Sequence, residues 1–295
     1  MVIETLSPGA DLPIVRTIAD LRAVVGEWRR QGLSVGFVPT MGALHAGHLA
    51  LVAEGLSQTD RVVTSVFVNP TQFAAHEDLG TYPRREARDA ELLAEAGCHL
   101  LYAPSVEEMY PAGAVARIVV GDAEIGGPSQ TLEGAARPQM FGGVALVVTK
   151  LLNQVQPDVA VFGEKDWQQL AVIRRMVADL DMPVRIVGVP TARDGHGLAL
   201  SSRNAYLSET ELTTARRLNG VLAEAAIKAA AGASIESVEQ NAAAALLGAG
   251  FARVDYIAIR RPDLSAFEND RVDGPGRILA AAVLGTTRLI DNMAV

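Results

Sequence analysis

The chain has 295 residues, of which 49% are hydrophobic and 20% charged, as is typical of a globular protein long enough for two domains. Its formal net charge of −8 argues against a broad nucleic-acid-binding surface, and no apolar run reaches the roughly 20 residues that a membrane-spanning helix needs. The single cysteine, Cys98, rules out an intrachain disulfide and favours a cytoplasmic location.

Short apolar runs alternate with helical patterns along the first two-thirds of the chain. This alternation predicts an α/β fold with a parallel sheet covered on both faces, which binds ligands at the carboxyl ends of its strands. The predicted elements, in chain order, are a strand at 34–38, a helix at 48–56, a strand at 61–68, a helix at 84–96, a strand at 98–103, a helix at 142–156, a strand at 159–162, a helix at 167–180 and a strand at 184–189.

A polar segment rich in turn residues, 190–197, is the predicted domain boundary, which divides the chain into domains 1–190 and 191–295. Helices followed by strands beyond this boundary predict a smaller α+β C-terminal domain. The predicted elements there are helical stretches at 209–231 and 235–247 and strands at 254–260, 278–284 and 287–290.

The run PTMGALHAGH, residues 39–48, follows the first predicted strand and opens the first predicted helix. A glycine-containing turn lets backbone N–H groups approach a phosphate, and the helix N-terminus adds partial positive charge. His45 and His48 share one face if the helix has begun, and two imidazoles there can donate hydrogen bonds to a phosphate. Taken alone, the motif is equally compatible with an ordinary turn that carries two surface histidines.

A second motif, FGEKDWQQ at 162–169, also joins the end of a strand to the start of a helix. Lys165 is a mobile cation suited to phosphate, and Asp166 is suited to a helix cap or to magnesium. Gln169 lies one helical turn after Lys165, so the two side chains point the same way. A solvated lysine beside a simple helix cap remains the alternative.

The segment 200–204 combines Ser201, Ser202 and Arg203 on a loop just past the predicted domain boundary. Two hydroxyls and a guanidinium suit phosphate binding and closure over a nucleotide. A polar linker without a ligand is the more common meaning of such a cluster in isolation.

A fourth motif, FVNPTQF at 67–73, follows the second predicted strand. Gln72 offers both a donor and an acceptor, which suits a hydroxy acid, although a plain connecting loop is an equally good interpretation. The sequence also lacks a P-loop and lacks G-x-G-x-x-G after its first strand, so neither of these nucleotide sites is expected.

The order and spacing of the motifs are more specific than any motif alone. PTMGALHAGH, FVNPTQF, YPR at 82–84, FGEKDWQQL, VGVPTARD, LSSRN and LGTTRLIDN together resemble the pantothenate synthetases over essentially the whole chain. That family belongs to the H-I-G-H nucleotidyltransferase superfamily. The resemblance implies a Rossmann-like N-terminal domain, a smaller C-terminal domain that acts as a lid, and a homodimer.

The resemblance also implies roles for individual residues. Asn69, Gln72 and Gln169 would bind or support pantoate, with Gln72 near the incoming β-alanine. His48, His45, Lys165 and Arg203 would be catalytic. The implied ATP contacts are Met41, Gly42, Ala43, Leu44, His45, Ala46, Gly47, His48, Gly163, Glu164, Lys165, Asp166, Ala192, Leu200, Ser201, Ser202 and Arg203.

The implied reaction has two steps, adenylation of pantoate by ATP and attack of β-alanine on the acyl-adenylate. Mg²⁺ would help offset the phosphate charge, but the sequence does not identify its protein ligands. Two alternatives stay open, another adenylyl-transferring enzyme of the same superfamily and a non-catalytic nucleotide-binding regulator.

Three positions depart from the expected family pattern. Ala46 stands where glutamate is common, Leu200 replaces a methionine, and Met140 stands where a histidine is usual. The exchange of methionine for leucine nearly conserves volume and should matter little. None of the three removes a group to which a chemical role is assigned.

Overall fold

A computed structural model describes residues 12–74, 78–121 and 126–295, and these residues form two compact units. The N-terminal unit contains the described residues up to Val120, together with Arg137–Glu164 and Val172–Val189. The C-terminal unit contains the described part of Gly121–Ala136, together with Lys165–Ala171 and Pro190–Val295. Two segments that precede Pro190 in the sequence therefore belong with the C-terminal unit.

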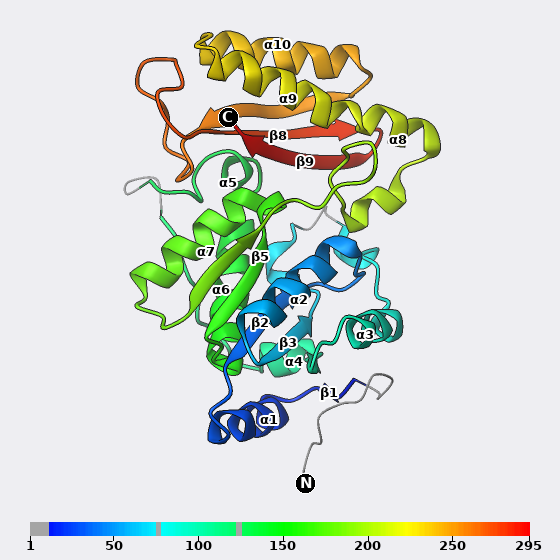
Figure 1. The fold of residues 1–295 in the computed structure, drawn as a ribbon, viewed down its shortest axis with the longest axis vertical. Helices are drawn as coiled ribbons and strands as arrows, with labels where there is room; N and C mark the ends of the chain where they lie inside the picture. Colours follow the sequence, from blue (N-terminus) through cyan, green and yellow to red (C-terminus); the bar gives the residue numbers. More distant parts are fainter. Residues whose placement is uncertain (1–11, 75–77, 122–125) are drawn as a thin grey trace. The chain divides into compact units, whose positions relative to one another are not determined.

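The N-terminal unit is built on a six-stranded sheet in which every strand pair is parallel, so the predicted α/β fold is confirmed (Figure 1). The central strands are almost completely buried, because helices on both faces exclude water from their valine-rich runs. In spatial order the strands are β1 (Ile14–Val15), β4 (Leu100–Tyr102), β3 (Arg61–Val66), β2 (Val35–Thr40), β5 (Val159–Gly163) and β6 (Arg185–Val189).

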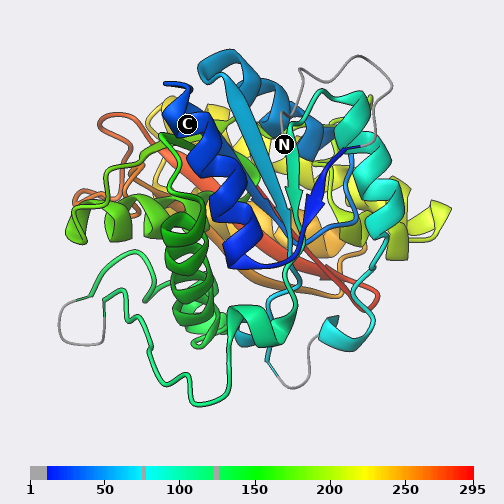
Figure 2. The same cartoon turned by 90° about the horizontal axis from the view of Figure 1, so that it is seen from below.

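The helices predicted between these strands are present, whereas the short helix α4 (Val106–Met109) and the elements at the start of the chain were not predicted. No element was predicted before residue 34, whereas α1 (Ile18–Arg30) buries Leu21, Val25 and Trp28 and packs against α6 (Figure 2, blue). The other elements are α2 (Ala46–Gln58), η1 (Pro70–Gln72), η2 (Asp78–Gly80), α3 (Glu86–Glu95), α4 (Val106–Met109), α6 (Met140–Val155), η3 (Glu164–Asp166) and α7 (Trp167–Asp179), whose first turns belong to the C-terminal unit.

The helices α3 and α6 each end at a residue in the left-handed backbone region. Gly97 follows α3 with a φ of 78°, which confirms its predicted place beyond the helix end. Gln156 ends α6 with a φ of 52° and a ψ of 55°, a conformation that costs free energy for a residue with a Cβ. The N–H group of Gln156 donates to the Leu152 carbonyl at 2.8 Å, which closes the helix.

The C-terminal unit covers one face of an antiparallel sheet with helices, in agreement with the predicted α+β domain. The single helical stretch predicted at 209–231 is wrong in one respect, because Arg216 separates two helices. The elements are α5 (Glu133–Ala136), η4 (Ser202–Tyr206), α8 (Glu209–Ala215), α9 (Arg217–Ala230), α10 (Ile235–Gly248) and the strands β7 (Arg253–Arg260), β8 (Arg277–Leu284) and β9 (Thr287–Ala294).

The helices of the described ranges are all too short or too polar to cross a lipid bilayer.

Candidate active site

The turn between β2 and α2 has a backbone shape that needs glycine. Gly42 and Ala43 follow each other in the left-handed region, with φ values of 86° and 52°. A Cβ on Gly42 would lie 3.0 Å from both the Val66 side chain and the Asp89 carboxylate. The glycine therefore allows the turn to lie directly against β3 and α3.

Asp89 of α3 holds this turn through two backbone amides. Its side chain is buried, with 1% of the residue exposed, and accepts hydrogen bonds from Ala43 N at 2.9 Å and Leu44 N at 2.8 Å. Burial raises the pKa of the Asp89 carboxyl, and the two amide donors act in the opposite direction.

The amides of the turn differ from the sequence-based expectation. They were expected to approach a phosphate, but Ala43 and Leu44 donate to Asp89, and Gly42 N donates to Thr40 Oγ1 at 3.1 Å. The sequence pattern gave no sign of Asp89, because this residue lies on α3 and its role depends on the tertiary fold.

His45 and His48 are brought together by a reciprocal capping box. His45 is the N-cap of α2 and its Nδ1 accepts from Gly47 N at 3.1 Å, while His48 Nδ1 accepts from His45 N at 3.3 Å. The ring centroids are 4.2 Å apart with an interplanar angle of 44°. Because Nδ1 is the acceptor in both neutral rings, the proton of each ring lies on Nε2, which is a hydrogen-bond donor.

Gln72 lies next to the histidine turn, although it follows a different strand. Its Nε2 donates to Met41 Sδ at 3.2 Å, and its Oε1 accepts from Asn69 Nδ2 at 3.0 Å. These two contacts fix the orientation of the Gln72 amide. The carboxyl ends of β2 and β3 therefore place Met41 and Gln72 in contact, as expected for neighbouring parallel strands.

Asn69 is a buried support for this segment, with 1% of the residue exposed. Its Oδ1 accepts from Thr71 Oγ1 at 2.9 Å and from Tyr110 Oη at 2.8 Å. Its Nδ2 donates to the Gly143 carbonyl at 3.2 Å. Burial raises the pKa of Tyr110, which keeps its hydroxyl protonated as a donor. Sequence reasoning missed the contribution of Tyr110, which no motif contains.

The helix α6 approaches η1 closely at Gly143. A Cβ on this glycine would lie 2.3 Å from the Thr71 carbonyl oxygen, well inside the van der Waals distance. Nearby lies Met140, which stands where the family pattern has a histidine. Its side chain has a local partner, because Arg137 Nη1 lies 2.8 Å from Met140 Sδ. The methionine sulfur therefore accepts from a guanidinium at a position where an imidazole was expected.

The strand β5 ends at Gly163, and Glu164 begins η3, so these two residues belong to the N-terminal unit. Lys165, Asp166 and Gln169 belong to the C-terminal unit. Lys165 Nζ lies 3.7 Å from Asp166 Oδ1, and its side chain is 20% exposed. Two of the predicted ATP contacts are thus next to each other in the chain and oppositely charged.

Gln168 has a structural role that the sequence did not suggest. It is buried, and its Nε2 donates to the carbonyls of Pro128 at 2.7 Å and Thr131 at 2.6 Å. Its Oε1 accepts from Glu133 N at 3.0 Å. Glu133 in turn binds Arg288 of β9 through both carboxylate oxygens, at 2.8 and 2.7 Å.

The remaining predicted residues lie in and after a tight reversal of the C-terminal unit. The Ala192 carbonyl accepts from Leu200 N at 2.9 Å, and Arg193 pairs with Ala199 across the reversal. Ser201 then caps η4, since its Oγ accepts from Arg203 N at 3.3 Å. The backbone of Ala192 is therefore held beside Leu200 and the start of the serine-rich segment.

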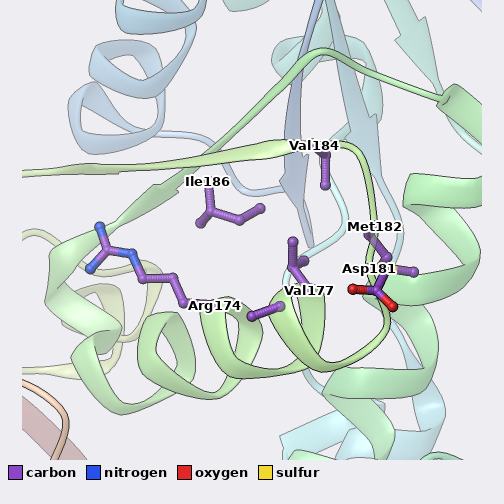
Figure 3. A pocket seen from close by; sticks show the side chains of 7 residues that line it. Arg174, Val177, Asp181, Met182, Val184 and Ile186 are labelled. Atoms are coloured by element: carbon purple, nitrogen blue, oxygen red, sulfur yellow. The ribbon is translucent and has the colours of Figure 1, made fainter.

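A shallow hollow lies elsewhere in the N-terminal unit, between α7 and β6 (Figure 3). Its volume is about 550 Å³, and Figure 3 shows Arg174 and Asp181 at its two ends with Val177 and Ile186 between them. None of the predicted site residues lines it. The lining residues are Arg174, Val177, Ala178, Asp181, Met182, Val184 and Ile186.

The parallel sheet and the paired histidines at the end of a central strand are the arrangement expected from the resemblance to the H-I-G-H nucleotidyltransferase superfamily. A family model described as pantoate-beta-alanine ligase matches residues 13–294. The chain belongs to this family.

Curated relatives and solved structures agree with the family model. A pantothenate synthetase from Caulobacter vibrioides is 56% identical, with 96% of this chain and 98% of that protein covered. One from Mesorhizobium japonicum is 54% identical, with 96% of this chain and 97% of that protein covered. A pantothenate synthetase structure from Thermus thermophilus has a TM-score of 0.88 at 46% identity, with 96% of this chain and 99% of that chain covered. A pantoate-beta-alanine ligase from Francisella tularensis, complexed with beta-gamma ATP and beta-alanine, has a TM-score of 0.79 at 33% identity, with 96% and 97% covered.

Proposed function

We propose that the chain condenses pantoate with β-alanine at the expense of ATP, and that His45, His48 and Gln72 act directly on the substrates. The contact between Gln72 and Met41 carries this proposal, because it places a polar amide beside the histidine turn at the carboxyl edge of the sheet. An imidazole pair suits the phosphates of ATP, and an oriented amide suits the hydroxyl and carboxylate groups of pantoate.

In the first step the pantoate carboxylate attacks the α-phosphorus of ATP. A new phosphorus–oxygen bond forms while the bond to the pyrophosphate oxygen breaks, so pyrophosphate leaves. The Nε2 donors of His45 and His48 would stabilise the negative charge that builds on the phosphate oxygens. The capping box orients both rings before ATP binds, which reduces the reorganisation needed during the reaction.

In the second step the neutral amine of β-alanine attacks the acyl carbon and AMP leaves. A carboxylate is a poor acyl donor, and adenylation gives its oxygen a good leaving group. Gln72 would lie near both pantoate and the amine, with its amide fixed by Met41 and Asn69. Positioning and electrostatics would provide most of the rate, and no covalent bond to the protein is needed.

Further ATP contacts are proposed for the C-terminal unit. Lys165 would bind phosphate oxygens in place of the Asp166 carboxylate that it faces at 3.7 Å. Ser201, Ser202 and Arg203 would contact the nucleotide from η4, and the Ala192 backbone would contact the adenine. Gln169, in the first turn of α7, would bind pantoate.

Mg²⁺ is the proposed companion of ATP. The described ranges contain no group of three or more His, Cys, Asp or Glu side chains able to hold a metal ion. A magnesium ion would therefore be bound mainly by substrate phosphates and water. The half-exposed Asp166 would add one carboxylate ligand. When bound, the ion would neutralise part of the phosphate charge.

The test is a set of turnover assays with purified protein, ATP, magnesium and pantoate, with and without β-alanine. Pyrophosphate formation that needs pantoate but not β-alanine is expected from an acyl-adenylate intermediate, in amounts close to one per active site. Repeated release of AMP and pantothenate is expected only with all substrates present. ATP binding without turnover would instead favour a nucleotide-binding regulator, and an adenylylated product without amine would favour another adenylyl transferase.

The family resemblance also supports a homodimer. Val115 and Val119 lie on a segment of the N-terminal unit outside the described strands and are 87% and 75% exposed. Large contiguous apolar patches mark interaction sites, and these two valines are proposed to belong to one. Light scattering should give twice the chain mass of 31.1 kDa, and a Val115→Asp, Val119→Asp double variant should give the single mass.

The proposed location is the cytoplasm, where the single thiol would stay reduced.

A further inference from the structure

Asn292 on β9 contacts the backbone of the segment that carries Lys165. It is buried, with 3% of the residue exposed, and its Nδ2 donates to the Lys165 carbonyl oxygen at 2.8 Å. The two residues are 127 positions apart in the sequence and both belong to the C-terminal unit. A buried side-chain amide thus reaches the main chain of a residue that is proposed to bind phosphate.

The orientation of the Asn292 amide is determined by its two partners. Arg277 of β8 donates to Asn292 Oδ1, and a guanidinium has no acceptor. The Lys165 carbonyl can only accept, so it must receive the Nδ2 group. The contact therefore depends on the amide end of Asn292, and an isosteric carboxylate cannot replace it.

The same arginine also holds the chain on the other side of Asp166. The Arg277 guanidinium carbon lies 3.4 Å from the centroid of the Trp167 ring, a cation–π contact. The Trp167 Nε1 group donates to the Pro262 carbonyl at 2.9 Å. The C-terminal sheet and its connecting loop therefore hold the turn from both sides of Asp166.

We propose that Asn292 is a positioning residue that sets the direction of Lys165 toward the phosphates of ATP, an inference that rests on the proposed role of Lys165. A lysine side chain is flexible, so its reach depends on where its backbone is held. Without the contact to Asn292, the η3 turn loses its support on the Lys165 side and keeps the one at Trp167. Lys165 then spends more time away from the phosphates, for instance beside Asp166 at the 3.7 Å already present.

The proposal is tested with Asn292→Asp and Asn292→Ala, each made alone and together with Lys165→Ala. Asn292→Asp keeps the shape and the acceptor for Arg277 but places an oxygen against the Lys165 carbonyl. Asn292→Ala removes both contacts without adding a charge. The readout is kcat and KM for ATP in pyrophosphate formation, at enzyme concentrations high enough to follow the slow Lys165→Ala background.

The expected result is a loss of about tenfold in kcat/KM for ATP with either Asn292 variant, consistent with about one lost hydrogen bond. The KM for pantoate should change less than twofold. In the Lys165→Ala background the same variants should have almost no further effect, because the group that Asn292 positions has been removed. Met293→Ala, which changes the adjacent residue of β9 that packs on the core, is the matched control for lost stability.

The possible outcomes separate this inference from the proposed function. Equal losses in both backgrounds, or a loss matched by Met293→Ala at the same change in Tm, would mean that Asn292 has only a structural role. Full activity of both Asn292 variants, with a large loss for Lys165→Ala, would overturn the positioning role alone. An unimpaired Lys165→Ala variant would overturn the role of Lys165 itself.

Discussion

At the scale of single residues, the two histidines divide their ring nitrogens between structure and chemistry. In each ring Nδ1 accepts a hydrogen bond from a backbone N–H group at the start of α2. The ring proton therefore lies on Nε2, which is the hydrogen-bond donor. Protonation at Nδ1 would remove the acceptor and open the cap, so the cap and the donor depend on the same tautomer. Helix capping thereby prepares the groups proposed to act on the phosphate.

Two variants test this division of roles, one with asparagine and one with glutamine in place of His48. The Oδ1 of asparagine can stand near the position of Nδ1, whereas glutamine extends its amide toward the position of Nε2. His48→Asn should keep Tm close to the wild-type value but lower kcat about 10²- to 10³-fold, the usual loss for one donor at a developing charge. His48→Gln should keep more activity and less stability. Thermal unfolding and adenylation rates give the comparison, and equal activities of the two variants would contradict it.

At the scale of elements, close packing between a helix and a strand end shapes the proposed pantoate site. The approach of α6 to η1 depends on the missing side chain of Gly143. The same approach gives Asn69 its acceptor in the Gly143 carbonyl. Helix packing therefore fixes the segment that carries Gln72.

The variant Gly143→Ala should displace this segment, because its Cβ would lie 2.3 Å from the Thr71 carbonyl oxygen. We expect a rise in KM for pantoate of about tenfold or more and a loss of stability of about 1–3 kcal/mol from overpacking. Gly142→Ala is the matched control, since its Cβ would meet only the Ile118 carbonyl, at 3.5 Å. Steady-state kinetics and urea unfolding measure both effects. Similar results for the two variants would argue against this role of Gly143.

The first turn of α3 carries an ion pair with a defined pH dependence. Arg16 donates to Glu86 at 2.5 Å, and this hydrogen bond lowers the pKa of the Glu86 carboxyl below its usual 4.5. A lowered pKa stabilises the fold above pH 4.5, and the contribution is lost as the pH falls through the folded-state value. Glu86→Gln should lower the free energy of unfolding by about 0.2–1 kcal/mol at about pH 7, because the pair is exposed. Urea unfolding should show a difference that shrinks as the pH falls below 4.5, and a difference that does not change with pH would contradict the ion pair.

The sequence predicted most elements and few of the contacts that shape the site. Strand and helix patterns are local, so β2, β3, β5, α2, α3 and α6 were found within a few residues. The helix α1 was missed, and the break at Arg216 interrupts an alanine-rich stretch without glycine or proline to mark it. The roles of Asp89 and Asn292 depend on partners 45 to 127 positions away, which no local pattern reveals.

At the scale of the whole molecule, the chain is organised as two compact units with separate cores. The single cysteine lies in the core of the N-terminal unit, where Cys98 is 3% exposed and burial raises the pKa of its thiol. A buried, protonated thiol reacts slowly with disulfide reagents.

Cys98 should therefore report the opening of the N-terminal unit. Labelling by an aromatic disulfide reagent is expected to be slow in native buffer and complete within the mixing time in denaturant. Its rate in intermediate urea should follow unfolding measured by circular dichroism. Fast labelling of the native protein would show that the core around β3 and β4 opens locally. Saturating ATP and pantoate should slow the labelling, if they bind the folded unit.

The C-terminal unit is made of three separate segments of the chain, so its parts are synthesised at different times. Lys165 leaves the ribosome 127 residues before Asn292, and Glu133 leaves 155 residues before Arg288. At about 5–20 residues per second, the Lys165 turn waits roughly 6 to 25 s for the strand that holds it. A nascent chain with a finished parallel sheet therefore still lacks the contact that holds the Lys165 carbonyl. If Lys165 binds phosphate as proposed, activity would begin only after β9 has been made.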